Sequence, residues 1–251
     1  MTYVYEPRGR AREYCERALN LYRNCTHGCR YCWVPAAMHT TREQMLNPRV
    51  RDIPEFKLRK ELAALKGRSV LLCFTCDPYQ PLDVTEAVTR RTIQLLHEYR
   101  VKAVVLTKGG SRSARDFDLL STRPDLSAYG ATLTFVSAKD SAEWEPGAAP
   151  PSDRMRALKR AHNLGIPTWA SLEPVVDPKQ SLEIIRRTHE YVDTYKIGKW
   201  NYDKRANTID WAAFATSAVT LLRSLGKEYY IKQDLAVFLP RGLKKAAKLT
   251  T

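Results

Sequence analysis

The chain alternates short β-rich runs with longer amphipathic stretches, and this alternation restricts the folds that are open to it. Six strands are predicted, over Ala18–Arg23, Ser69–Phe74, Lys102–Thr107, Ala131–Val136, Pro167–Leu172 and Thr194–Ile197. Six helices are predicted to follow them, over Glu55–Lys66, Val84–Tyr99, Ala114–Ser121, Ser152–Leu164, Gln180–Tyr191 and Thr208–Leu225. Successive βα units predict an α/β fold with a parallel sheet and right-handed crossovers, either an open doubly wound sheet or a barrel.

The length and the continuity of this pattern indicate a single domain. The chain has 251 residues, which is enough for one large core, and we find no internal repeat or low-complexity linker. We expect one domain over residues 1–251, with its core at about 18–225. The basic tail at 241–251 is expected to be loosely ordered.

The charge balance is strongly basic. Lysine and arginine number 41 against 27 aspartates and glutamates, which gives a formal net charge of +14. Such a balance favours a polyanionic partner such as DNA or RNA, because neutralising phosphates releases counterions. The alternative is a basic surface that only keeps the protein soluble.

The apolar runs are short. The stretch from Val101 to Thr107 is far too short to cross a bilayer, and the first fourteen residues lack the apolar core of a signal peptide. We therefore expect a cytoplasmic protein without membrane association.

Three of the six cysteines form a CxxxCxxC motif at Cys25, Cys29 and Cys32. Cysteines this close together do not build a disulfide framework, and in a reducing compartment they indicate metal or redox chemistry. Three thiolates on one loop can bind three irons of a 4Fe-4S cluster and leave the fourth iron open. The amino and carboxylate groups of S-adenosylmethionine (SAM) can chelate that iron. Its sulfonium then accepts an electron, which yields a 5′-deoxyadenosyl radical.

A zinc site made from the three cysteines and His27 is the competing interpretation. His27 lies between the cysteines on the same short loop, so the geometry of such a site would be cramped. Zinc sites more often combine two separated Cys or Cys/His halves, and the sequence offers no second half.

Chemically distinctive residues follow several of the predicted strands. The cysteine motif follows the first strand, Cys76-Asp77-Pro78 the second and Lys108 the third, while Glu173 and Lys199 follow the fifth and sixth. The carboxyl ends of parallel strands meet at one edge of a sheet, where α/β enzymes place their active sites. These residues are therefore expected to share one pocket.

Five sequence blocks resemble a known family. They are NLYRNCTHGCRYCW, TCDPYQPLD, TKGGSRSARDFDLL, EPGAAPPSDRMRALKRAHNLGI and SLEPVVDP. From about Leu21 to Lys199 the chain resembles the radical SAM superfamily, and within it the group related to spore photoproduct lyase, a group of DNA repair photolyase-like proteins. The resemblance implies a partial (β/α)6 barrel that carries the 4Fe-4S cluster and SAM at the top of its sheet.

The same resemblance implies roles for individual residues. Tyr31 would lie near the adenine of SAM, Thr75 and Cys76 near its amino end, and Lys108 near its carboxylate. Thr134, Ser171 and Glu173 would contact the ribose and methionine parts, and Lys196, Lys199 and Asn201 are weaker candidates for substrate contact. Each also has an ordinary alternative, such as packing, a turn, a solvated lysine or a surface carboxylate.

The chain departs from the family pattern at two places. Spore photoproduct lyase carries a hydrogen-donor cysteine three residues before the aspartate of the second-strand block, where this chain has Phe74, with cysteines at 73 and 76 instead. Cys76 is a candidate hydrogen donor, with a buried inert thiol as the alternative. No cysteine follows Cys76, which excludes the extra C-terminal clusters of the peptide-modifying branch.

Three functions remain open at this point. The first is a lyase-like radical SAM enzyme that abstracts hydrogen from a nucleobase in DNA or RNA, supplied with electrons by a flavodoxin- or ferredoxin-type donor. The second is a radical SAM enzyme that acts on a small molecule or peptide. The third is a zinc-stabilised nucleic-acid-binding module without catalysis.

Overall fold

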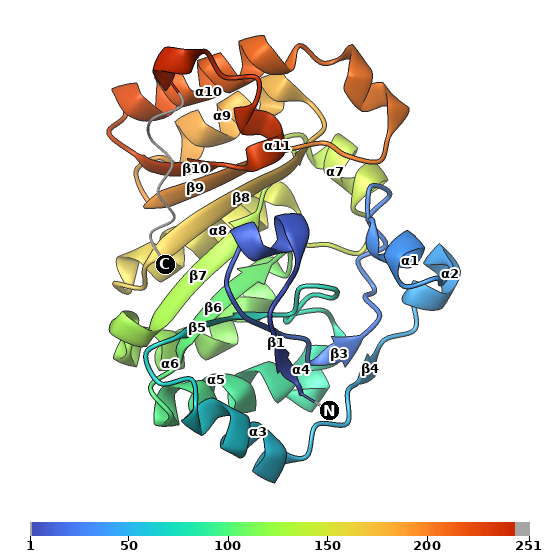
Figure 1. Ribbon diagram of the computed structural model, residues 1–251, viewed down its shortest axis with the longest axis vertical. Helices are drawn as coiled ribbons and strands as arrows, with labels where there is room; N and C mark the ends of the chain where they lie inside the picture. The colour runs from blue at the N-terminus through green and yellow to red at the C-terminus, as the bar shows by residue number, and fades with distance from the viewer. Residues whose placement is uncertain (1, 244–251) are drawn as a thin grey trace.

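The computed structural model of the chain describes residues 2–243, and its centre is a sheet of eight strands (Figure 1). In spatial order these strands are β1 (Val4–Tyr5), β2 (Ala18–Leu19), β5 (Ser69–Leu72), β6 (Lys102–Thr107), β7 (Ser127–Thr132), β8 (Thr168–Val175), β9 (Thr194–Lys199) and β10 (Glu228–Ile231). β1 pairs with β2 antiparallel, and all other neighbours in this sheet are parallel. β3 (Tyr22–Arg23) and β4 (Arg49–Val50) form a separate antiparallel pair.

Helices connect the strands and cover the outer face of the sheet. The α-helices are α1 (Val34–Ala37), α2 (Arg42–Met45), α3 (Glu55–Ala63), α4 (Leu82–Glu86), α5 (Val88–Glu98), α6 (Phe117–Thr122), α7 (Ala138–Trp144), α8 (Pro151–Asn163), α9 (Pro178–Thr188), α10 (Trp211–Ser224) and α11 (Gln233–Ala236). The 3-10 helices are η1 (Gly9–Glu13), η2 (Gly110–Asp116), η3 (Pro124–Leu126), η4 (Lys204–Thr208) and η5 (Arg241–Leu243). None of the helices within residues 2–243 has the length and apolar character needed to span a bilayer.

The predicted α/β class is confirmed, and the sheet is open. Within residues 2–243 no pairing joins the edge strands β1 and β10. An open, mostly parallel sheet with helices on its outer face is the arrangement of a partial barrel. The predicted tail at 241–251 lies outside the described residues except for η5.

The sheet buries apolar side chains on both faces. On the outer side, α5, α8 and α9 contact β6, β7 and β8 over the main hydrophobic core. On the inner side a smaller cluster joins Cys15 and Ala18 to Leu71 and Trp169. Burial on both sides explains the nearly continuous apolar character of β5, whose sequence is SVLL. The N-terminal segment with η1, dark blue in Figure 1, crosses in front of this inner face.

The first predicted strand is divided in the structure. β2 ends at Leu19, because the Asn20 side chain turns to the neighbouring strand end and its Oδ1 accepts the amides of Phe74 (2.7 Å) and Thr75 (3.0 Å). The chain then enters β3, which pairs with β4 outside the main sheet. A side chain that replaces a ladder bond in this way leaves no mark in the hydrophobic pattern.

Two other predictions need correction, and one strand was not predicted. The fourth strand begins at Ser127 and ends at Thr132, so the prediction of 131–136 is wrong. Nearly all residues from 127 to 136 are buried, the exceptions being residues 128 and 136. Because the burial continues past the end of the strand, the apolar pattern alone cannot set the boundary. The helix predicted over 84–99 is broken at Ala87, whose φ of +48° separates α4 from α5. β10 was missed.

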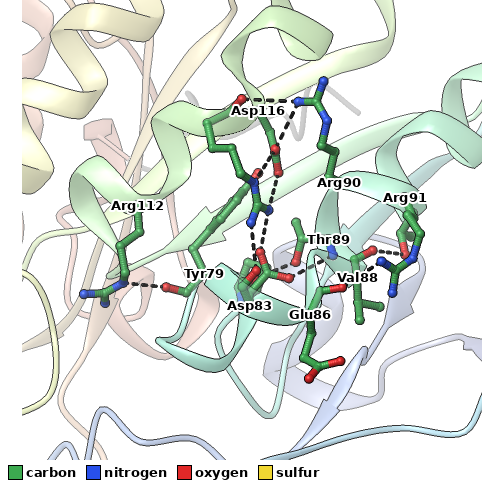
Figure 2. Close-up of polar contacts among 12 residues, drawn as sticks. Tyr79, Asp83, Glu86, Val88, Thr89, Arg90, Arg91, Arg112 and Asp116 are labelled. Carbon is green, nitrogen blue, oxygen red and sulfur yellow. Dashed lines mark hydrogen bonds and ion pairs between the residues drawn. The ribbon is translucent and has the colours of Figure 1, made fainter.

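A buried carboxylate fixes this break between α4 and α5. Asp83 is 1% exposed, and its oxygens accept the Thr89 amide at 2.9 Å, the Arg115 guanidinium at 2.6 Å and the Tyr22 hydroxyl. Figure 2 shows Asp83 bonded to Thr89, with Arg90 paired to Asp116 beside it. Since Tyr22 belongs to β3, Asp83 ties α4 and α5 to the strand that leads into the cysteine motif.

We expect Asp83→Ala to lower the free energy of unfolding by about 3 kcal/mol, because it leaves the buried Tyr22 hydroxyl without its partner and removes one of the two carboxylates that pair with Arg115. The matched control is Asp118→Ala, which removes an exposed pair with Arg90 and should cost less than about 1 kcal/mol. Urea unfolding of both variants measures the difference. Equal losses would mean that Asp83 does not have this anchoring role.

A lysine holds the N-terminal segment against the sheet. Lys196 on β9 donates from Nζ to the backbone oxygens of Tyr14 (2.7 Å) and Glu13 (3.3 Å). Burial lowers the pKa of Lys196 to about 8, whereas an unfolded lysine titrates near pH 10.4. Between about pH 8 and pH 10 the unfolded chain therefore binds more protons than the folded one. Stability contributed through Lys196 accordingly rises with pH across that window.

Lys196→Met should remove this pH-dependent component of stability. Relative to the variant, the wild type should gain at most about 3 kcal/mol of unfolding free energy between about pH 7 and pH 10.5. Chemical denaturation across this range measures it, with Lys179→Met on the exposed start of α9 as the control. Parallel profiles of the wild type and Lys196→Met would contradict the assignment.

Candidate active site

The three cysteines of the motif share one cavity at the carboxyl-terminal edge of the sheet. Cys25, Cys29 and Cys32 are free thiols that line a space of about 550 Å³. The same space is lined by residues at or just beyond the ends of five strands, namely Cys76, Lys108, Thr132, Lys199 and Lys232. The pocket expected from the order of strands and distinctive residues is therefore present.

Backbone contacts hold the loop that carries the cysteines, residues 24–33, which we call the cysteine loop. The Cys25 amide donates to the Met45 carbonyl at 2.9 Å, and the Arg42 guanidinium donates to the carbonyl of Cys29 at 2.8 Å. Gly147 packs so closely that a Cβ atom there would lie 2.1 Å from the Thr26 carbonyl oxygen. The loop is thus supported from α2 on one side and from the segment after α7 on the other.

The environment of these thiols suits metal ligands that are shielded from water. Burial raises the pKa of Cys29 to about 12 and also raises that of Cys25. A buried thiol keeps its proton until a metal replaces it, since the thiolate is the ligand. Three free thiols on one braced loop, all facing one cavity, fit the three protein ligands of an open 4Fe-4S cluster.

His27 lies on the same loop but is engaged elsewhere. It is 2% exposed, its Nε2 is 3.2 Å from the Arg112 guanidinium, and its Nδ1 is 3.5 Å from an oxygen of Asp77. Burial lowers the pKa of His27 to about 4, so the ring is neutral at pH 7. Arg112 can only donate, which assigns the ring proton to Nδ1, facing Asp77. Both ring nitrogens therefore have protein partners, and the zinc alternative gains no support. Figure 2 shows Arg112 also bonded to Tyr79.

Tyr31 is positioned by a buried ion pair. Its hydroxyl donates to Glu145 and lies 3.3 Å from Thr134 Oγ1, while Glu145 accepts from Arg154 at 2.6 Å. Burial raises the pKa of Glu145, but the charges of Arg154 and Lys108 together with the hydrogen bonds to the carboxylate outweigh burial, so the pKa is lowered and the pair is ionic. The Lys108 ammonium lies 5.6 Å from the centre of the Tyr31 ring. Thr134 itself is fully buried, in the loop after β7, and acts on the cavity only through Tyr31.

A second polar group lies at the ends of β8 and β10. Glu173 accepts from the Lys232 ammonium at 2.5 Å and from the Tyr14 hydroxyl, which is 2.9 Å from Ser171 Oγ. Lys232 also lies 4.0 Å from the centre of the Tyr14 ring. Glu173, Lys232 and Tyr14 line the cavity, whereas Ser171 is buried beneath them.

Most of the predicted site residues come together, and a few do not. Those that line the cavity are Cys25, Cys29, Tyr31, Cys32, Thr75, Cys76, Lys108, Glu173, Lys199 and Asn201. Lys196 lines a different cavity of about 780 Å³ at the amino-terminal end of the strands, so it does not join the site. Sequence reasoning missed Tyr14 and Lys232. Lys232 directly follows the β-rich run EYYI, so recognising β10 would have found it.

Aromatic and basic side chains gather where the cavity opens. Trp33 and Phe74 pack with ring centroids 5.6 Å apart, and both line the cavity. Tyr202, which is 81% exposed, lies beneath the guanidinium of Arg10 at 5.0 Å. Arg8 is exposed and lines the same space.

Comparison with known sequences identifies the family of the chain. The radical SAM superfamily matches residues 19–192, which is more than half of the chain. An uncharacterized protein of Acidianus two-tailed virus, ORF301, is 24% identical over 193 residues that cover 70% of this chain. The match covers 61% of that viral protein, so the chain spans less than two thirds of its length.

Solved structures share the fold at low sequence identity. Streptococcus suis SuiB bound to S-adenosylmethionine superposes with a TM-score of 0.64 and 13% identity, over 86% of this chain and 49% of SuiB. Spore photoproduct lyase complexed with dinucleoside spore photoproduct gives 0.68 and 11%, over 86% of this chain and 76% of the lyase. Identities this low establish the fold alone. The sequence match over residues 19–192 shows that the chain belongs to the radical SAM superfamily, whose members use a 4Fe-4S cluster and SAM.

Proposed function

We propose that Cys25, Cys29 and Cys32 bind a 4Fe-4S cluster and that SAM binds beside it in the 550 Å³ cavity, for hydrogen abstraction from a nucleobase in DNA or RNA. The observation that supports this most directly is the convergence of the three free thiols with Lys108 and Glu173 on one cavity. When bound, the cluster passes an electron to the sulfonium of SAM and so yields a 5′-deoxyadenosyl radical. A flavodoxin- or ferredoxin-type protein would supply the electron.

The residues around the cavity have distinct roles in this proposal. The Lys108 ammonium pairs with the carboxylate of SAM, and Thr75 and Cys76 face its amino end. Tyr31 presents its ring to the adenine, held in place by Glu145 through its hydroxyl. Glu173 accepts from the ribose hydroxyls.

Two of the predicted contacts are indirect. Thr134 orients Tyr31, and Ser171 orients Tyr14, because both are buried behind these tyrosines and reach the cavity only through hydrogen bonds. They are therefore positioning residues in the proposed site.

The cavity opening supports a nucleic acid as substrate. The paired rings of Trp33 and Phe74 offer apolar surface, and Tyr202 with Arg10 offers a ring next to a positive charge. Aromatic rings and arginine planes bind unpaired bases, while basic side chains bind the phosphates beside them. The net charge of +14 acts in the same direction. Hydrogen abstraction from a base requires that base to leave its stack, which such an opening would favour.

Replacing any one of Cys25, Cys29 or Cys32 with Ala should abolish the cluster. After anaerobic reconstitution the wild type should be brown, with absorption at about 400 nm from thiolate–iron charge transfer, and should form 5′-deoxyadenosine from SAM with dithionite. The Ala variants should show neither property. Cys15→Ala is the matched control, because Cys15 is a buried cysteine of the inner apolar cluster and should leave both unchanged. A colourless wild type that holds zinc would sink the proposal.

Binding to a single-stranded oligonucleotide should weaken steeply with salt. The slope of log K against log salt should be negative, and Arg8→Ala should reduce its size by about 1 if that arginine contacts one phosphate. Arg186→Ala, on the exposed face of α9, should leave the slope unchanged. Fluorescence anisotropy at several salt concentrations measures both. A flat slope in the wild type would favour a small molecule or peptide as the substrate instead.

A further inference from the structure

Two cysteines outside the cysteine loop lie together on the cavity. Cys73 and Cys76 bracket Phe74 and Thr75 in the turn that follows β5, in the spacing CxxC. Both are free thiols, and both line the 550 Å³ cavity together with the cysteine loop. CxxC is the spacing of the reactive thiols in disulfide oxidoreductases.

Neighbouring backbone groups contact the two sulfurs. The Sγ of Cys73 accepts the Leu21 amide at 3.5 Å, and the Sγ of Cys76 donates to the Tyr22 carbonyl at 3.3 Å. Residues 21 and 22 are consecutive, so one short stretch of chain anchors both thiols. Burial, followed by a hydrogen bond with Cys76, raises the pKa of Cys73 well above the ordinary value.

The backbone at Cys73 adopts a conformation that favours this pairing. Its φ is +62°, in the left-handed region that residues with a Cβ rarely occupy. Cys73 directly follows Leu72, the last ladder residue of β5, so this conformation turns the chain out of the strand toward residue 76. Such outliers tend to persist where the surrounding structure requires them.

The two thiols differ in access. Cys73 is 5% exposed and belongs to the main core, while Cys76 is half-buried at the surface of the cavity. Cys76 is therefore the more accessible of the two thiols to a radical held in the cavity.

We propose that Cys76 and Cys73 form a donor and resolving pair for the radical reaction, which rests on the proposed function. Cys76 gives its S–H hydrogen atom to the product radical, so the product is reduced and Cys76 becomes a thiyl radical. The Cys73 thiol then loses a proton to solvent and forms an S–S bond with it. The extra electron passes to an oxidised flavodoxin- or ferredoxin-type carrier. A dithiol reductant supplies two electrons and two protons to restore both thiols.

One tryptic peptide reports on this pair. Cleavage after Arg68 and Arg90 releases residues 69–90, which contain Cys73 and Cys76 and no other cysteine. In this peptide a disulfide removes two hydrogens and blocks alkylation at both sulfurs. Mass spectrometry therefore separates the pair from the cluster ligands and from Cys15.

The first experiment needs no turnover. The reconstituted holoenzyme is equilibrated anaerobically with mixtures of reduced and oxidised dithiothreitol, then denatured, alkylated and digested. We expect the peptide to change from two alkylated thiols to one disulfide as the oxidised fraction rises, at constant iron content. Cys15→Ala should behave in the same way. A peptide that stays fully alkylated at every ratio would overturn the proposal.

The second experiment uses SAM alone as the probe, with reduced flavodoxin and no thiol present. The 5′-deoxyadenosyl radical should then take its hydrogen from Cys76, so one disulfide should accumulate for each 5′-deoxyadenosine. Cys73→Ala should still form 5′-deoxyadenosine while its peptide shows no disulfide. Production of 5′-deoxyadenosine by the wild type with both thiols intact would refute the pair. Absence of 5′-deoxyadenosine would count against the proposed function instead, and the dithiothreitol equilibrium would still decide whether the pair forms.

Discussion

Parallel pairing from β2 through β10 is the constraint on which the rest of the structure depends. Because these strands run in one direction, their carboxyl ends reach a single edge of the sheet. Residues that are distant in sequence therefore meet there, such as Cys76 after β5, Lys108 after β6 and Glu173 in β8. The helices cover the outer face, so the inner face remains for a cavity and for the side chains that chemistry requires.

The open sheet makes this cavity dependent on the N-terminal segment. Within residues 2–243 the edge strands β1 and β10 do not pair with each other, so the sheet does not close into a barrel. The N-terminal segment with η1 crosses the inner face of this open sheet. Tyr14 belongs to this segment and meets Glu173 and Lys232. Three parts of the chain thus build one wall of the cavity. Lys196 on β9 holds this N-terminal segment in place by donating a hydrogen bond to the Tyr14 carbonyl.

The α/β class, the parallel order and the shared pocket follow from periodicity and from the position of polar residues after strands, both of which are local properties. What the sequence could not predict depends on single long-range contacts. The Asn20 amide ends β2 early by bonding to the end of β5, and Asp83 breaks one predicted helix into two through its bond to Thr89. The family resemblance implied that Ser171 and Thr134, on the predicted fifth and fourth strands, touch the cofactor. Register does not decide depth, and both lie behind tyrosines.

The buried charges flank the cysteine loop, and this placement has a physical reason. A short loop of polar residues and cysteines has little apolar surface to fix its position, so hydrogen bonds must do so. Tyr22, just before the loop, donates its hydroxyl to Asp83, and Tyr31, near the end of the loop, donates its hydroxyl to Glu145. Each of these carboxylates is also paired with an arginine. Apolar replacements could match the stability of such pairs but would leave both tyrosine hydroxyls without partners. The proposed cubane would require three thiols in fixed relative positions, and two buried ionic anchors, one before Cys25 and one before Cys32, supply that constraint.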